Sequence, residues 1–226
     1  MECKKFRTID YVEKMPTVPG EKMPVLIYLH GAGARRGKLE QIVNHEFFSR
    51  SVMAAEGSPL LTVAPLCYAN SWFEMFEELQ RFVNMIASRP DVDSKRVYLM
   101  GASMGGYGTW QLAMTLPDLF AAIVPICGGG MYWDAYQLRT TPVWAWHGVL
   151  DPVVKPEETV KMVAAINSHA DCPRARLTML ENTEHNAWSP AFASRELMDW
   201  LLSQTKCDEK IDPKNLFAGT VQFGLL

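Results

Sequence analysis

The sequence predicts an α/β fold built on a mostly parallel central sheet of about six to seven strands, with helices on both faces. Short apolar runs alternate with longer segments of helical period, which is the rhythm of parallel strands joined by helices. Several of these runs are apolar at consecutive positions, as expected for strands that are covered on both faces. The predicted strands are 24–30, 60–64, 96–102, 121–127, 142–147 and 175–180.

The segments between these runs have the spacing of amphipathic helices. Residues 72–88 place apolar side chains three or four apart on one stripe, namely Phe73, Phe76, Leu79, Val83 and Ile86. Segments 156–169 and 190–203 each open with a proline, a residue that suits the first helical turn. Segment 103–116 is a further predicted helix, ended by Pro117. Residues 5–12 are a candidate edge strand.

The chain reads as one domain over residues 1–226, with a core at about 24–204 and a C-terminal tail at 205–226. Its 226 residues are 48% hydrophobic and 21% charged, which is ordinary for a globular protein. No linker rich in Pro, Gly or Ser divides it. The tail has no clear period, and its apolar residues are expected to pack on the body or on a neighbouring subunit: Phe217, Val221, Phe223, Leu225 and Leu226.

Composition and charge argue against several classes of partner. The net charge is -3 and no basic run is present, so nucleic acid is not expected as a partner. The most apolar stretch, 121–127, is far shorter than the roughly 20 residues of a membrane span, so no membrane partner is expected. Five widely spaced cysteines and an N-terminus without a signal sequence favour a cytoplasmic protein without disulfides or a metal site. The oligomeric state stays open.

The strongest motif is Gly101-Ala102-Ser103-Met104-Gly105, which directly follows a predicted strand and opens a predicted helix. Gly-x-Ser-x-Gly in this context is typical of a nucleophile elbow, a sharp strand-to-helix turn that exposes the serine. The glycines on either side allow the neighbouring backbone to approach closely. The motif therefore predicts Ser103 as a nucleophile.

A serine nucleophile needs a histidine base and a carboxylate that orients it, in the chain order Ser, Asp, His. Asp151 follows the strand that ends at His147, and His185 lies in the polar loop after the last strand. The other histidines lie upstream or in helices, so His185 is the predicted base and Asp151 the predicted acid. Glu184 is an alternative orienting residue, but it adjoins the base in the same loop.

Backbone donors for a developing oxyanion are predicted at two places. One is the N–H of Met104, directly after the nucleophile, and the other is the N–H of Ala32 in the small-residue loop 31–34. A phosphate-binding loop is the alternative for these glycines. It fails because Arg36 stands where a third glycine is needed, and because Tyr107 stands where a Walker loop has its lysine.

Over about residues 24–204 the chain resembles the α/β-hydrolases, in particular small serine esterases of the phospholipase/carboxylesterase and dienelactone-hydrolase-like group. That group includes feruloyl esterases, polyester depolymerases and predicted peptidases. The matching segments are Leu29-His30-Gly31-Ala32-Gly33, Gly101 to Gly106, Pro117-Asp118-Leu119-Phe120, His147-Gly148 through Asp151, and His185 with Trp188. The resemblance implies the same roles for Ser103, Asp151 and His185, and no cofactor.

The chain departs from that pattern in two places. Few residues precede the His-Gly strand, so the first strands of the usual eight are expected to be shortened or absent. The segment between Cys127 and Pro142 is too short for a helical cap, so no cap domain and an open cleft are expected. Three tryptophans in loops on the expected active-site side are candidate substrate-binding residues: Trp72, Trp133 and Trp188.

These observations predict a serine hydrolase that cleaves small or short-acyl carboxylic esters through an acyl-enzyme, with a small-molecule ester as its partner and no metal or other cofactor. The same catalytic residues can also cleave amides and thioesters, so a peptidase or a thioesterase is the nearest alternative. A non-catalytic binding protein on the same fold is the alternative from another class, since fold alone does not fix function.

Overall fold

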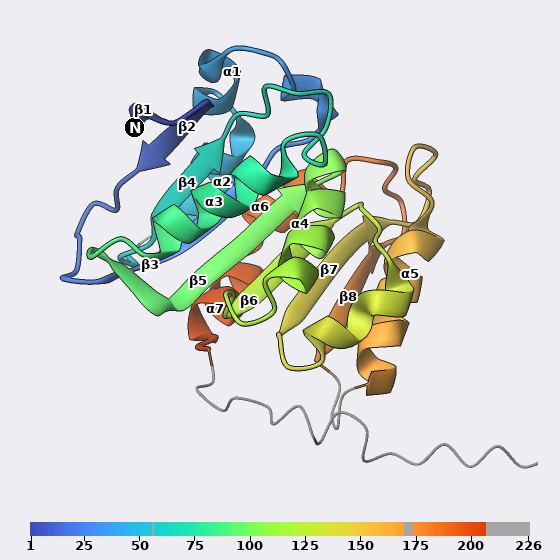
Figure 1. Ribbon diagram of the computed structural model, residues 1–226. Coiled ribbons are helices and arrows are strands. Elements are labelled where there is room, and N and C mark those ends of the chain that lie inside the picture. Colours follow the sequence, from blue (N-terminus) through green and yellow to red (C-terminus); the bar gives the residue numbers. More distant parts are fainter. Residues whose placement is uncertain (56, 170–173, 207–226) are drawn as a thin grey trace, which may run out of the picture.

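The computed structural model describes residues 1–55, 57–169 and 174–206, and its centre is one eight-stranded sheet. The strand order is β1-β2-β4-β3-β5-β6-β7-β8 (Figure 1). The strands are β1 (Glu2–Phe6), β2 (Ile9–Lys14), β3 (Met23–Leu29), β4 (Leu61–Pro65), β5 (Val92–Ala102), β6 (Ala122–Ile126), β7 (Val143–Gly148) and β8 (Ala175–Leu180).

The six strands from β3 to β8 pair in parallel, which confirms the predicted α/β class. The predicted number of six to seven strands was too low. The N-terminal segment forms two strands, not one edge strand: β1 pairs antiparallel with β2, and β2 pairs antiparallel with β4. The apolar residues 217–226 of the predicted tail lie outside the described residues.

Helices cover both faces of the sheet, as predicted (Figure 1). One face carries α3 (Phe76–Ala87), α4 (Met104–Thr115) and α5 (Pro156–His169), and the other carries α2 (Glu46–Ala54), α6 (Trp188–Ala193) and α7 (Arg195–Ser203). Shorter elements are α1 (Leu39–Val43) and the 3-10 helices η1 (Ala32–Ala34) and η2 (Tyr132–Leu138).

Two predicted helices differ from the structure. The segment predicted as a helix over 190–203 is two helices, because Ser194 ends α6 and its hydroxyl accepts a hydrogen bond from the N–H of Leu197 at the start of α7. The helix predicted from 72 begins only at Phe76, after a turn.

The core consists of two apolar clusters, one on each face of the sheet. Alternate residues of β3 show the division, since Ile27 and Leu29 belong to one cluster while Leu26 and Tyr28 belong to the other. Between β6 and β7 the chain forms only η2. In the described part of the chain no helical cap therefore covers the carboxyl ends of the parallel strands. None of the described helices is long and apolar enough to span a membrane.

Candidate active site

Ser103 sits on a sharp turn between β5 and α4. Its φ of 57° and ψ of −118° are a backbone conformation that L-residues rarely adopt. Gly101 and Gly105 on either side cannot be replaced by larger residues, because a Cβ at either position would collide with the backbone. A Cβ on Gly101 would lie 2.2 Å from the carbonyl oxygen of Gly105, and a Cβ on Gly105 would lie 1.9 Å from that of Leu29. The turn has the geometry that the Gly-x-Ser-x-Gly motif predicts.

The structure brings the three predicted side chains together in one hydrogen-bonded chain. Nε2 of His185 lies 2.8 Å from Oγ of Ser103, and Nδ1 of His185 lies 2.7 Å from Oδ2 of Asp151. Because a carboxylate only accepts, Nδ1 carries a proton and Nε2 is left to accept the serine proton. Glu184, the alternative orienting residue, is exposed, and Nδ1 of His185 donates to Asp151 instead.

Two loops meet to place Asp151 beside His185. The N–H of Val149 donates to the carbonyl oxygen of Leu180, and the N–H of Leu150 donates to that of Thr183. Gly148 makes this approach possible, because a Cβ there would lie 2.3 Å from the Thr183 carbonyl oxygen. The loop after β7 is therefore joined to the loop after β8, which carries the histidine.

Asp151 is held as a carboxylate in a buried position. Its exposed fraction is 3%, and burial by itself would raise its pKa. Hydrogen bonds from His185 and from the N–H groups of Val154 and Val153 outweigh burial and hold the pKa of Asp151 below its ordinary value. The charge that orients the imidazole is thus maintained by the loop itself.

The predicted oxyanion donors lie at the starts of two helical elements that flank the serine. Met104 is the first residue of α4 and Ala32 is the first residue of η1, where N–H groups have no partner inside the helix. The loop with Ala32 lies against the serine, since a Cβ on Gly31 would lie 3.5 Å from the Cβ of Ser103. Ala32 also lines the cavity next to Ser103.

The prediction that Trp72 lines the substrate site was wrong. Trp72 is fully buried, and its Nε1 donates a hydrogen bond of 3.0 Å to the carbonyl oxygen of His30. His30, which sequence reasoning set aside, accepts from the N–H of Cys67 at Nε2 and donates from Nδ1 to the carbonyl oxygen of Gly31. Burial lowers the pKa of His30 to about 4, so the ring stays neutral and fixes the start of the oxyanion loop.

A cavity of about 550 Å³ opens beside Ser103 and His185. Of the three predicted tryptophans only Trp188 lines it. Trp133 lies outside the cavity with an exposed fraction of 68%, because η2 turns its side chain toward solvent. The remaining lining residues are Tyr28, Gly31, Ala32, Gly33, Ala34, Gln41, His45, Ala102 and Val153.

Glu46 of α2 fixes the indole ring of Trp188, which lines the cavity. Its Oε1 accepts from Nε1 of Trp188 at 2.9 Å, and both of its carboxylate oxygens accept from the Ser189 hydroxyl. The Trp188 ring then packs edge-on against His185, with centroids 5.4 Å apart. Sequence reasoning missed Glu46, since no local motif connects it with residues more than a hundred positions away.

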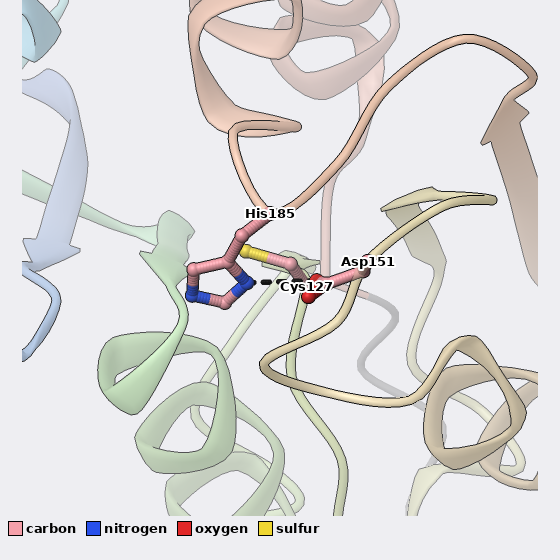
Figure 2. Close-up of side chains that lie close together, drawn as sticks. All are labelled: Cys127, Asp151 and His185. Carbon is pink, nitrogen blue, oxygen red and sulfur yellow. Dashed lines mark hydrogen bonds and ion pairs between the residues drawn. The ribbon is translucent and has the colours of Figure 1, made fainter.

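Cys127, at the end of β6, adjoins the Asp151–His185 pair (Figure 2). One potential ligand atom from each of these three residues lies within 4.8 Å of the others. The cluster suits a metal poorly, because burial raises the pKa of the Cys127 thiol to about 12 and the other two side chains already share a hydrogen bond. The arrangement is suited to proton transfer from Ser103 instead.

Comparisons with known proteins agree with this architecture. A model of the prolyl oligopeptidase family matches residues 73–146. The crystal structure of a thermostable esterase superposes with a TM-score of 0.72 and 27% identity, covering 90% of this chain and 63% of that chain. The chain has the α/β-hydrolase fold.

Parts of the chain also match longer proteins. It is 25% identical over 95 residues to a bifunctional acetylxylan esterase/xylanase of Neocallimastix patriciarum, covering 42% of this chain and 14% of that protein. It is 37% identical over 51 residues to poly(3-hydroxyalkanoate) depolymerase C of Paucimonas lemoignei, covering 23% of this chain and 12% of that protein. The chain thus spans a small part of either enzyme.

Proposed function

We propose that the protein is a serine hydrolase that cleaves carboxylic esters of small or short-acyl substrates. The observation that carries the proposal is the hydrogen-bonded chain from Ser103 through His185 to Asp151, placed on a strained turn beside a cavity. Proteins named as esterases and a polyester depolymerase among its relatives support ester chemistry.

In the proposed reaction, Oγ of Ser103 attacks the ester carbonyl carbon while Nε2 of His185 takes the hydroxyl proton. Asp151 holds the imidazole and stabilises its charged form, and the N–H groups of Ala32 and Met104 bind the tetrahedral oxyanion. His185 then gives its proton to the leaving alcohol, which leaves an acyl-enzyme on Ser103. A water molecule, deprotonated by His185, releases the acid and restores the serine.

The test compares wild type with Ser103→Ala and His185→Ala, using short nitrophenyl esters and a fluorophosphonate label. Both variants should lose turnover by several orders of magnitude, because members of such a triad act as a unit. Ser103→Ala should also lose the label. Ser88→Ala is the matched control, since Ser88 lies at the exposed end of α3 and its hydroxyl bonds to the carbonyl oxygen of Asn84. Full labelling of Ser103→Ala would place the nucleophile elsewhere.

A peptidase is the second candidate, because the prolyl oligopeptidase family model matches residues 73–146. A panel of esters, thioesters and aminoacyl anilides of equal acyl size separates the three activities by kcat/KM. Wild-type protein that folds but hydrolyses none of them and takes no label would favour a non-catalytic binding protein on this fold.

A further inference from the structure

A second histidine contacts the carboxylate of Asp151 from inside the protein. His147 lies near the end of β7 and is completely buried. Its Nε2 lies 3.0 Å from the carbonyl oxygen of Val154 and 3.2 Å from Oδ2 of Asp151. Both neighbours are acceptors, so Nε2 carries a proton, which it donates to the Val154 carbonyl oxygen while the N–H group also faces the carboxylate.

The opposite side of the His147 ring is anchored to α5. Its Nδ1 lies 2.6 Å from the hydroxyl oxygen of Thr159, and the same oxygen lies 2.6 Å from the carbonyl oxygen of Gly128. Thr159 is buried, with an exposed fraction of 1%. The ring is therefore fixed between the end of β6, helix α5 and the loop that carries Asp151.

The two oxygens of Asp151 have different partners. Oδ1 accepts from the N–H groups of Val153 and Val154 at 2.8 and 2.9 Å. Oδ2 faces Nδ1 of His185 at 2.7 Å and Nε2 of His147 at 3.2 Å. The backbone bonds reach one oxygen only, and His147 is the side chain that faces the other oxygen from the side opposite His185 within the protein interior.

We propose that His147 is a positioning residue that holds Oδ2 of Asp151 toward His185. The inference rests on the proposed ester hydrolysis. His147 is not among the residues that line the cavity, so its effect should appear in kcat and not in KM. It touches no substrate atom and acts through Asp151 alone.

Loss of this N–H group also has an electrostatic consequence. Without the positive end of an N–H dipole 3.2 Å from it, the charge on Oδ2 attracts the imidazole proton more strongly. The rising limb of the pH profile of kcat/KM should then move to higher pH. The other ionisable groups near Asp151 are Cys127, directly after β6, and Tyr107 on α4, which also interacts with Glu158 on α5. All three stay in place in the variants proposed here.

The experiment uses two amides at this position. In His147→Gln the amide reaches the place of Nε2 and can still donate to Asp151, whereas in His147→Asn it reaches only the place of Nδ1 beside Thr159. We expect His147→Asn to lose about tenfold in kcat, as for one lost polar contact with a charged group, with KM little changed and the pH midpoint raised. His147→Gln should recover most of the loss.

Trp144→Phe is the matched control for a merely structural effect. Trp144 is buried on the same strand and loses a hydrogen bond to the Thr178 hydroxyl in this variant, far from the catalytic chain. It should lower the melting temperature but keep kcat and the pH midpoint. Equal loss in His147→Asn and His147→Gln, or an unchanged pH midpoint in His147→Asn, would overturn the positioning role.

A variant of Thr159 and the rate of fluorophosphonate labelling test the same role of His147. Thr159→Val leaves the His147 ring but removes its anchor, so it should shift the pH midpoint in the same direction by less; no shift counts against the inference. The rate of fluorophosphonate labelling at Ser103 needs the same proton transfer but no ester. If wild type labels yet hydrolyses no ester, the proposed function fails, and the labelling profile of His147→Asn still decides the positioning role.

Discussion

At the scale of single residues, backbone strain at Ser103 is the structural cost of presenting the nucleophile. A positive φ with a ψ of −118° costs an L-residue about 1–3 kcal/mol, whereas glycine adopts it freely. The strain persists because β5 and α4 fix the residue from both sides, and the N–H of Ser103 is tied to the carbonyl oxygen of Ile126 at 2.9 Å. Stability and presentation of the hydroxyl therefore oppose each other here.

This strain predicts an unusual order of stability among inactive variants. Ser103→Gly should be more stable than Ser103→Ala by about 1 kcal/mol, since glycine relieves the strain and loses only part of the gain to its greater unfolded-state entropy. Chemical denaturation of both proteins measures the difference. At Ser88, where φ is −90°, glycine should be no better than alanine. A less stable Ser103→Gly would mean that the turn is not strained.

Sequence reasoning located the catalytic candidates because their signals are local. A motif marks Ser103, and chain order with loop position marks Asp151 and His185, which the structure places in one hydrogen-bonded chain. It misjudged Trp72 because burial of a loop tryptophan depends on distant packing. It also missed the role of His147, whose partner Thr159 comes from the next helix.

At the scale of elements, the parallel strands were predictable and the N-terminal hairpin was not. Strands β3, β4, β6 and β7 are mainly apolar runs, and helix α5 and strand β8 have the predicted bounds. Strand β5 begins at Val92 and not at the predicted residue 96, because residues 93–96 are polar and give no apolar pattern. Strand β1 is mostly exposed, with Lys4 and Lys5 on the edge of the sheet, so no apolar pattern reveals it. Its partner β2 carries a buried charge, Glu13, which an apolar pattern does not predict either.

Glu13 should make the hairpin sensitive to acid. Burial alone would raise its pKa, but ion pairs with Arg89 and Lys4 outweigh burial and hold the pKa below its ordinary value. A carboxylate with a lowered folded-state pKa stabilises the fold at neutral pH, and this stabilisation is lost as pH falls through that pKa. Glu13→Gln should therefore lower the free energy of unfolding by about 1–2 kcal/mol at pH 7.

The difference between Glu13→Gln and wild type should shrink as the pH falls below the ordinary pKa of glutamate, because protonated Glu13 resembles glutamine. Denaturant titrations at several pH values measure it. Asp10→Asn is the control in the same hairpin, since the pair between Lys5 and Asp10 is largely exposed and should contribute little. A difference that stays constant with pH would contradict the role of the Glu13 charge.

At the scale of the whole molecule, two apolar clusters pack the sheet on both faces, and the catalytic candidates lie in loops at the carboxyl ends of its parallel strands. Loops after β3, β5, β7 and β8 supply Ala32, Ser103, Asp151 and His185, and all follow the carboxyl ends of parallel strands. The sequence predicts this placement, because connections in parallel sheets follow fixed rules. It could not predict the size of the cavity, which depends on how α2 and α6 pack across the same face.

The uncapped site predicts the preferred acyl group. The cavity beside Ser103 is bounded by Trp188 and has no cap in the described residues, so we expect it to cover only the acyl atoms near the serine, and each methylene contributes about 0.8 kcal/mol only while it is covered. We expect kcat/KM to be greatest for acetyl to butyryl or small aryl esters and to decline by octanoyl, measured below the aggregation limit of each ester. In the described residues no cap covers the cavity, so we expect the hydrolysis rate not to rise when the substrate is emulsified. A preference for palmitoyl over butyryl esters would instead require a longer acyl channel.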